Sequence, residues 1–167
     1  VISNEREGKL KTESQLLKDF EEAVFACMSQ AVKRKRWLKA ISRLESDENF
    51  AAMRLEQIAE AFTTYGEKQA KEIARKRFMK MSSGHKIVLL TTTALVNLVE
   101  EKTLLLIDEP ESHLHPPLLS AFTRALSEIL HDRNGVAIVA THSPVMVQEV
   151  PRSCVWKISR SGLQWRK

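Results

Sequence analysis

The sequence has few glycines, few aromatic residues and no long hydrophobic run. Its five glycines include no G-x-x-x-x-G-K-[ST] pattern, in which backbone N–H groups and a lysine hold the phosphates of a nucleotide. No apolar run approaches the roughly 20 residues that a membrane-spanning helix needs, and Glu and Lys interrupt residues 1–30, unlike a signal peptide. These absences predict an intracellular, cytoplasmic protein with no membrane part, and a chain without a phosphate loop of its own.

Cysteine is scarce as well, since the chain has only Cys27 and Cys154. Neither has a partner at a spacing that indicates a disulfide framework or a metal site, so both are expected to be free thiols in a reducing compartment. The 167 residues are enough for one domain with a hydrophobic core. Val1 stands where an initiator methionine is expected, which predicts that further residues precede this chain in the natural protein.

Positive charge is concentrated in the first half of the chain. The net charge is +5, and residues 1–80 carry 17 Lys and Arg against 13 Asp and Glu. The densest clusters, Lys33–Trp37 and Arg75–Phe78, each place an aromatic residue beside basic ones. Such a patch can follow a nucleic-acid backbone, although exposed helix faces rich in Lys and Arg are common without a ligand. Contact with DNA is therefore one of two interpretations of this charge.

Residues 1–77 are expected to form a helical insertion or arm. After residue 13 this region has no proline and one glycine, Gly66, and it is rich in helix-favouring residues. Apolar residues at helical spacing over 16–28 and 55–62 predict two or three helices. A break is expected near residues 46–49, where Ser, Asp and Asn can cap a helix, and another at Gly66.

From residue 78 onward the pattern changes to alternating helices and strands. We expect a helix from Ser83 to about Val99, a strand over Thr103–Asp108, a helix from Pro117 to about His131, a strand over Val136–Ala140, a helical turn over Val145–Glu149, and a third strand over Cys154–Ser159 that turns at Ser161-Gly162 towards Leu163–Trp165. The first two strands are apolar on both faces, as in a buried parallel sheet. The alternation predicts an α/β fold, whose ligands bind at the carboxyl ends of the strands.

Two adjacent carboxylates, Asp108 and Glu109, end the first of these strands. A carboxylate at a strand end can hold Mg²⁺ while the metal bridges nucleotide phosphates, which is the role expected for Asp108. Neighbouring side chains diverge there, so Glu109 can face a water beside the γ-phosphate and act as general base or orient that water. His142 follows the second strand and can donate a hydrogen bond to the same phosphate.

A small turn, Met81–His85, opens the helix that begins near Ser83. A helix N-terminus offers unpaired N–H groups and a partial positive charge, which attract phosphate. The hydroxyls of Ser82 and Ser83 add donors, and Gly84 lets the backbone approach closely. An ordinary serine N-cap has the same appearance, but the position of the turn shortly before Asp108 favours phosphate binding.

A metal site is a further interpretation of Glu111, His113 and His115, because a His-x-His pair with a nearby carboxylate can bind zinc. Leu114 and Pro116 indicate a loop leading into a helix. No further ligand cluster accompanies them in the sequence, and the spacing suits contacts across an interface better.

Taken in order, these motifs resemble those of ATP-binding cassette (ABC) ATPases. Met81–His85 resembles the signature motif, Leu104–Glu109 the Walker B strand, Glu111–Pro116 the D-loop and His142 the switch histidine. The likeness covers about residues 78–160. The phrase Asp-Glu-Pro-Glu-Ser-His-Leu-His-Pro resembles the soluble RecF, SMC and OLD-type branch more than it resembles transporter subunits. Within that branch it is similar to ATPases of anti-phage systems, such as the PtuA-type ATPases of Septu and retron systems.

The resemblance implies a P-loop NTPase fold of the ABC-head type, with residues 78–167 as the C-terminal lobe, and hydrolysis of ATP with Mg²⁺. Two heads would form a head-to-tail dimer around two nucleotides. The resemblance then places Ser82, Ser83 and Gly84 on the γ-phosphate of the opposite head, Asp108, Glu109 and His142 on the nucleotide of their own head, and Ser112 and His113 across the interface. The family's Walker A lysine and Q-loop are missing, so the upstream half of the same ATPase would supply them. The signature also departs from many members, with His85 in place of Gln and Ser83 in place of Gly.

For partners, the resemblance implies DNA and a nuclease or other effector subunit, in DNA maintenance or anti-phage defence. Two alternatives remain open. An ATPase subunit of a membrane transporter is the first, and Glu111–Pro116 argues against it. An ATP-bound scaffold with little turnover is the second, and Glu109 with His142 argues against that one.

Overall fold

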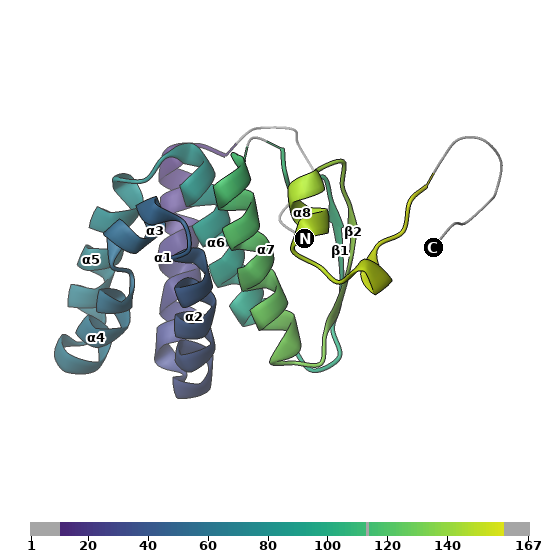
Figure 1. Cartoon of the computed structure of the whole chain (residues 1–167). Coiled ribbons are helices and arrows are strands. Elements are labelled where there is room, and N and C mark those ends of the chain that lie inside the picture. The colour runs from purple at the N-terminus through teal and green to yellow at the C-terminus, as the bar shows by residue number, and fades with distance from the viewer. Residues whose placement is uncertain (1–10, 113, 159–167) are drawn as a thin grey trace.

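The protein is described by a computed structural model that covers residues 11–112 and 114–158. A helical layer comes first in the chain, and a small parallel sheet lies at the other end of the molecule (Figure 1). The elements are α1 Glu13–Ser29, α2 Ala31–Leu44, α3 Glu48–Met53, α4 Glu56–Tyr65, α5 Glu67–Met79, α6 Ser83–Leu98, β1 Leu104–Asp108, α7 Pro116–His131, β2 Val136–Ala140, α8 Pro144–Gln148 and a short 3₁₀ helix over Arg152–Cys154.

Between residues 11 and 80 the chain forms five helices, so the expectation of two or three was wrong. The breaks near Asp47 and at Gly66 were expected. Asp47 caps α3 by accepting hydrogen bonds from two backbone N–H groups, and Gly66 has a φ of 83° between α4 and α5. The unexpected breaks are at Gln30, which is extended between α1 and α2, and at Arg54, whose φ is 50°. Neither residue is a helix breaker by type, so local propensity does not reveal these bends.

From residue 81 the order of elements follows the sequence-based expectation closely. Strands β1 and β2 are parallel and in register from Leu104 opposite Val136 to Asp108 opposite Ala140. The crossover between them is α7, which begins with two prolines in its first turn, where a missing N–H costs nothing. The α/β character with a parallel sheet is therefore confirmed for this part of the chain.

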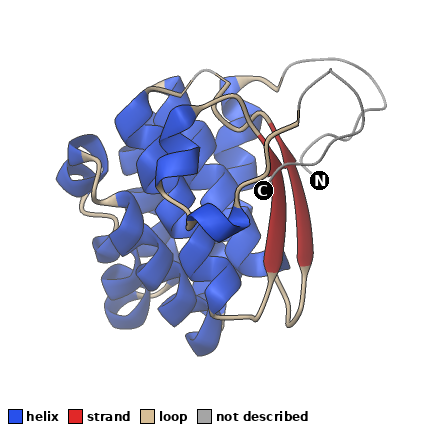
Figure 2. Ribbon diagram, turned by 45° about the vertical axis from the view of Figure 1, so that its right-hand side comes forward, coloured by secondary structure: helices blue, strands red, loops and turns tan. Residues whose placement is uncertain are grey.

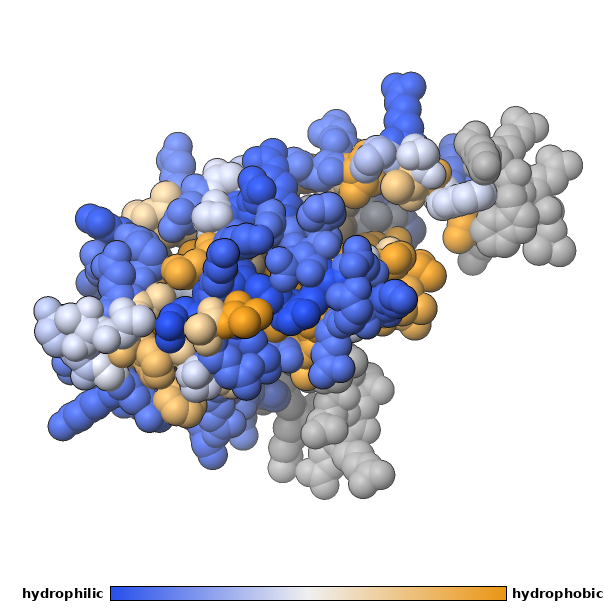
Figure 3. All heavy atoms as spheres, turned by 90° about the horizontal axis from the view of Figure 1, so that it is seen from below, coloured by the Kyte–Doolittle hydropathy of each residue, from blue (hydrophilic) through white to orange (hydrophobic). Residues whose placement is uncertain are grey.

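The two strands are not buried on both faces, as their composition led us to expect. Leu105, Ile107 and Ala137 pack against the helices. The other face is open: Leu106 is 75% and Ile138 is 60% exposed, and Leu104 and Val136 are exposed as well. Figure 2 shows the strands with helices on one side only, and hydrophobic atoms gather at this end of the molecule in Figure 3. Within the described residues, nothing covers the face made by Leu104, Leu106, Val136 and Ile138, which we call the open sheet face.

A third strand over Cys154–Ser159 is not present in the described part of that range. The 3₁₀ helix Arg152–Cys154 occupies its start, and a single bridge residue, Lys157, follows. The expected turn at Ser161-Gly162 and the segment Leu163–Trp165 lie outside the described residues. The sheet therefore has two strands in the part of the chain that can be described.

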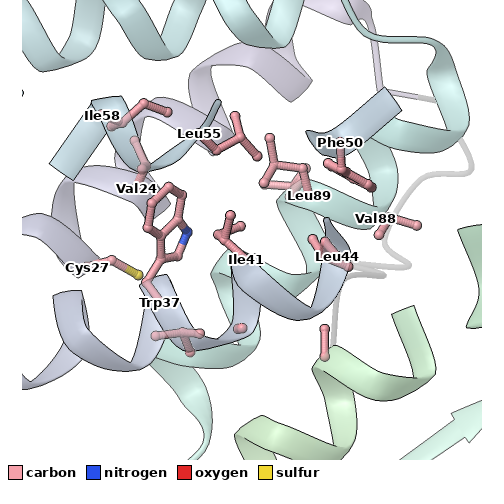
Figure 4. Close-up of a cluster of buried hydrophobic side chains, with 14 of the residues drawn as sticks. Val24, Cys27, Trp37, Ile41, Leu44, Phe50, Leu55, Ile58, Val88 and Leu89 are labelled. Carbon is pink, nitrogen blue, oxygen red and sulfur yellow. The ribbon is translucent and has the colours of Figure 1, made fainter. Parts of the chain in front are cut away.

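One hydrophobic core runs through the helices on both sides of residue 77. Helix α1 packs on α6 and α2 packs on α7. Trp37 of α2 is fully buried, and its indole N–H donates to the Thr93 hydroxyl of α6 at 3.0 Å; Figure 4 shows it among Val24, Cys27 and Ile41. The expected division into an arm (1–77) and a lobe (78–167) stays a prediction about roles, since the two parts pack together.

No helix in the described ranges is both long and apolar enough to cross a membrane. Cys27 is buried and Cys154 is exposed, and both are free thiols. Burial, the largest influence, raises the pKa of the Cys27 thiol to about 12.

Candidate functional site

Strand β1 delivers two carboxylates to the edge of the sheet. Asp108 is its last residue and pairs with Ala140 of β2. The Glu109 N–H donates to the Ala140 carbonyl at 2.9 Å, so the backbone stays attached to the sheet for one more residue. Glu109 has a φ of 41°. A glutamate in this left-handed region is strained, and residues of this kind occur at active sites as well as in turns such as those at Arg54 and Asn134.

His142 reaches the same place from the end of β2. Its Nε2 lies 3.3 Å from Oε1 of Glu109, and the side chains are 88% and 53% exposed, respectively. Asp108 is also exposed. The structure thus brings together the three residues that the sequence placed at strand ends, and it leaves all of them accessible to a ligand.

Glu111 connects the two loops, a role that our sequence reasoning did not anticipate. Its Oε1 accepts from the Thr141 hydroxyl at 2.8 Å and from the His142 N–H at 2.6 Å. Burial alone would raise the pKa of Glu111, but these hydrogen bonds lower it overall below its ordinary value. Glu111 therefore remains a carboxylate and holds the backbone of His142 beside Glu109. Only its position after the Asp-Glu pair could have indicated this role.

Ser82, Ser83 and Gly84 lie at the N-terminus of α6. Ser82 is the N-cap residue, and its hydroxyl accepts from the His85 N–H. Ser82 and Ser83 are exposed. In the described part of the chain, no hydrogen bond or ion pair joins these three residues to Asp108, Glu109 or His142. We call the start of α6 and the ends of the two strands the two polar surfaces of the chain.

Two of the three zinc ligands considered above lie in the described part of the chain, and both have other partners there. Glu111 is engaged by Thr141 and His142, and His113 lies outside the described residues. His115 instead caps α7, where its Nδ1 faces the Leu118 N–H at 3.4 Å. Ser112 is exposed, with its N–H bonded to the Glu109 carbonyl.

The donor types at the two surfaces fit the expected ligands. An exposed carboxylate such as Asp108 is a hard oxygen ligand of the kind that Mg²⁺ prefers, usually with several waters retained. The start of α6 offers serine hydroxyls and N–H groups of its first turn, a donor set that suits phosphate oxygens.

The basic clusters are largely engaged within the fold. Arg36 is buried, donates to the Val96 and Val99 carbonyls, and lies 3.0 Å from Asp132. Arg75 pairs with Glu21. These side chains stabilise helix packing, so the DNA contact stays a proposal that they do not support.

Residues 34–147 match the protein family described as "AAA domain, putative AbiEii toxin, Type IV TA system". The chain is also similar to Protein ea59 of Escherichia phage lambda, with 46% identity over 173 residues that cover 96% of this chain and 33% of that protein. The chain thus spans about a third of the length of this curated relative. No solved structure matches.

Proposed function

The chain belongs to this family of AAA domains, an ATPase-type family, and we propose that it provides the metal-binding and water-activating end of an ATP site. The finer proposal is a cytoplasmic ATPase of the soluble ABC type, from the RecF, SMC and OLD-like branch. The observation that carries it is the meeting of Glu109 and His142 beside Asp108, at the carboxyl ends of two parallel strands. In open α/β sheets this edge is where ligands bind.

The proposed mechanism assigns one task to each side chain. Asp108 would hold Mg²⁺, which when bound supplies positive charge against the β- and γ-phosphates. Glu109 would accept a proton from the attacking water, or orient that water. His142 would donate a hydrogen bond to the γ-phosphate. Glu111 acts through His142 as a positioning residue.

The open sheet face supports the proposal that another polypeptide segment completes the head. The described residues leave four apolar side chains uncovered on two short strands, and a contiguous exposed apolar patch of this kind often marks an interaction surface. We propose that the upstream half of the ATPase, which carries the phosphate loop, packs on this face. The greater length of the phage relative is in keeping with such a segment.

We propose, from the resemblance to ABC ATPases, that one nucleotide is shared between two heads, each of which contributes one of the two polar surfaces. The Ser82–Gly84 turn would contact the γ-phosphate bound to the opposite head in a head-to-tail dimer, and Ser112 and His113 would lie across that interface. ATP would then join the heads, and its hydrolysis would release them.

The wider role is proposed on likeness alone. The family description names a toxin–antitoxin system, and the relative is a phage protein. We propose that ATP turnover controls an effector such as a nuclease in anti-phage defence or DNA maintenance, as the resemblance to PtuA-type ATPases implies.

The test is phosphate release by the complete protein and its Glu109→Gln variant. Loss of a general base lowers turnover by about 10²- to 10⁴-fold, while the variant should still bind ATP, because Gln keeps the shape of the side chain. Glu100→Gln, the same change at an exposed residue before β1, is the control and should turn over normally. Normal turnover by Glu109→Gln would refute the assignment.

The alternatives give different results in the same experiments. A scaffold with little turnover would bind ATP but release no phosphate with or without DNA. A transporter subunit would be recovered with membranes from native cells.

A further inference from the structure

A chain of hydrogen bonds links the phosphate-facing turn to the helical region. Ser82 Oγ lies 2.7 Å from Nδ1 of His85, and Nε2 of His85 lies 3.0 Å from Oδ1 of Asp47. Ser82 is exposed, whereas His85 and Asp47 are only 6% and 3% exposed. These hydrogen bonds therefore run from the surface into the protein, and the bond between His85 and Asp47 joins residues 38 positions apart in sequence.

Asp47 determines which nitrogen of His85 carries a proton. Its Oδ1 also accepts from the N–H groups of Asn49 and Phe50, at 3.0 and 3.2 Å. Burial would raise the pKa of Asp47, but the hydrogen bonds from His85 and from these N–H groups lower it overall. An ionised carboxylate can only accept hydrogen bonds, so Nε2 of His85 must be the donor. Nδ1 is then the atom that faces Ser82.

Packing holds the imidazole ring in this position. The Phe50 ring of α3 lies 5.0 Å from the His85 ring, and the His115 ring at the start of α7 lies 5.6 Å away on centroid distances. The ring is thus held by α3 and α7 as well as by its own helix. It cannot rotate without breaking the bond to Asp47.

We propose that His85 is a positioning residue for the phosphate-contacting turn: it fixes the Ser82 side chain through Nδ1, and Asp47 of the helical region fixes His85. This inference rests on the proposed contact between Ser82 and phosphate. Through the buried carboxylate of Asp47, the helical region would then take part in the nucleotide site. A movement of the loop between α2 and α3 would reach Ser82 by this route.

The same side chains could instead suit a metal ion. Ligand atoms of Asp47, His85 and His115 all lie within 4.8 Å of one another. A metal would require the Nε2 lone pair of His85, and the hydrogen bond to Asp47 places a proton there. We therefore favour the hydrogen-bonded arrangement, and the experiment below includes a metal titration.

The first experiment reads the tautomer directly in this protein. Nitrogen-15 NMR of the histidine rings should show a protonated Nε2 for His85, with a proton shift that changes in Asp47→Asn and is unaffected in His131→Phe, a control at the exposed end of α7. A neutral ring protonated on Nδ1 would overturn the proposal. So would one equivalent of bound Zn²⁺ that His85→Phe removes.

The second experiment is a double-mutant cycle on ATP turnover in the complete protein. Ser82→Ala and His85→Phe should each lower the rate at saturating ATP by about threefold to tenfold, the worth of one hydrogen bond. The double variant should lose no more than Ser82→Ala alone, because His85 acts through Ser82. Additive losses would contradict the proposal, since a merely structural histidine would act independently of the serine.

The two experiments separate this inference from the proposed function. If the wild-type protein has no turnover that Glu109→Gln removes, the proposed function fails, and the histidine spectrum still decides the Asp47–His85 arrangement. If turnover behaves as proposed while the losses add, only the positioning role fails.

Discussion

The left-handed backbone at Glu109 should reverse the usual order of stability between alanine and glycine. At most positions glycine is less stable than alanine by about 0.5–1 kcal/mol, because the unfolded chain has more freedom to lose. With a φ of 41° at residue 109, an alanine Cβ carries a penalty of about 1–2 kcal/mol that glycine avoids. We therefore expect Glu109→Gly to be more stable than Glu109→Ala by up to about 1 kcal/mol.

Comparing the glycine variant with the alanine variant removes the interactions of the glutamate side chain from the measured difference in stability. Both variants lose the contact with His142 and the carboxylate, so the difference between them reports the backbone alone. The measurement is urea unfolding at equal m-values. Glu60 of α4 is the control position, being exposed and helical, and there glycine should be less stable than alanine by about 1 kcal/mol. If alanine were the more stable residue at both positions, the inference of stored strain at the site would be wrong.

Three further predictions follow from the buried groups. Arg36→Leu should lower the free energy of unfolding by about 3 kcal/mol, because it removes the buried partner of Asp132 and leaves the Val96 and Val99 carbonyls without their donor. Lys39→Leu removes only the exposed partner of the same aspartate and should cost less than about 1 kcal/mol. Equal losses in the two variants would contradict this prediction. A thiol-alkylating reagent should label exposed Cys154 in the native protein and leave Cys27 unlabelled, because burial and a raised pKa suppress the thiolate of Cys27. Rapid labelling of Cys27, detected by mass spectrometry, would contradict its burial in the core. Asp47→Asn should lower the free energy of unfolding by about 1–2 kcal/mol at pH 7. Because the pKa of this carboxyl is depressed in the folded protein, the difference between wild type and variant should shrink as the pH falls below about 4. A difference that does not change with pH would exclude the charged hydrogen bonds as its cause.

The elements that carry the site could be predicted because their signals are local. The apolar run that ends at Asp108, the proline-started helix that follows it and the second strand up to Ala140 each have a pattern complete within a few residues. The strand ends then placed Glu109 and His142 at one edge, and the structure confirms that they meet.

What could not be predicted depends on distant partners. The bend at Gln30 arises where α2 turns back to pack on α7, and no local residue type marks it. Asp47 looked like an ordinary helix cap, and its bond to His85 joins residues far apart in sequence. The exposure of the open sheet face could not be predicted, because an apolar strand has the same composition whether one or both of its faces are buried within the same segment.

The most direct test of the central claim is the structure of the complete protein with the Glu109→Gln change, bound to ATP and Mg²⁺. We expect the metal on the Asp108 carboxylate, the substituted side chain beside the γ-phosphate, and the Ser82–Gly84 turn of a second head on that same phosphate. Nucleotide bound elsewhere, with Asp108 facing solvent and the turn empty, would contradict it.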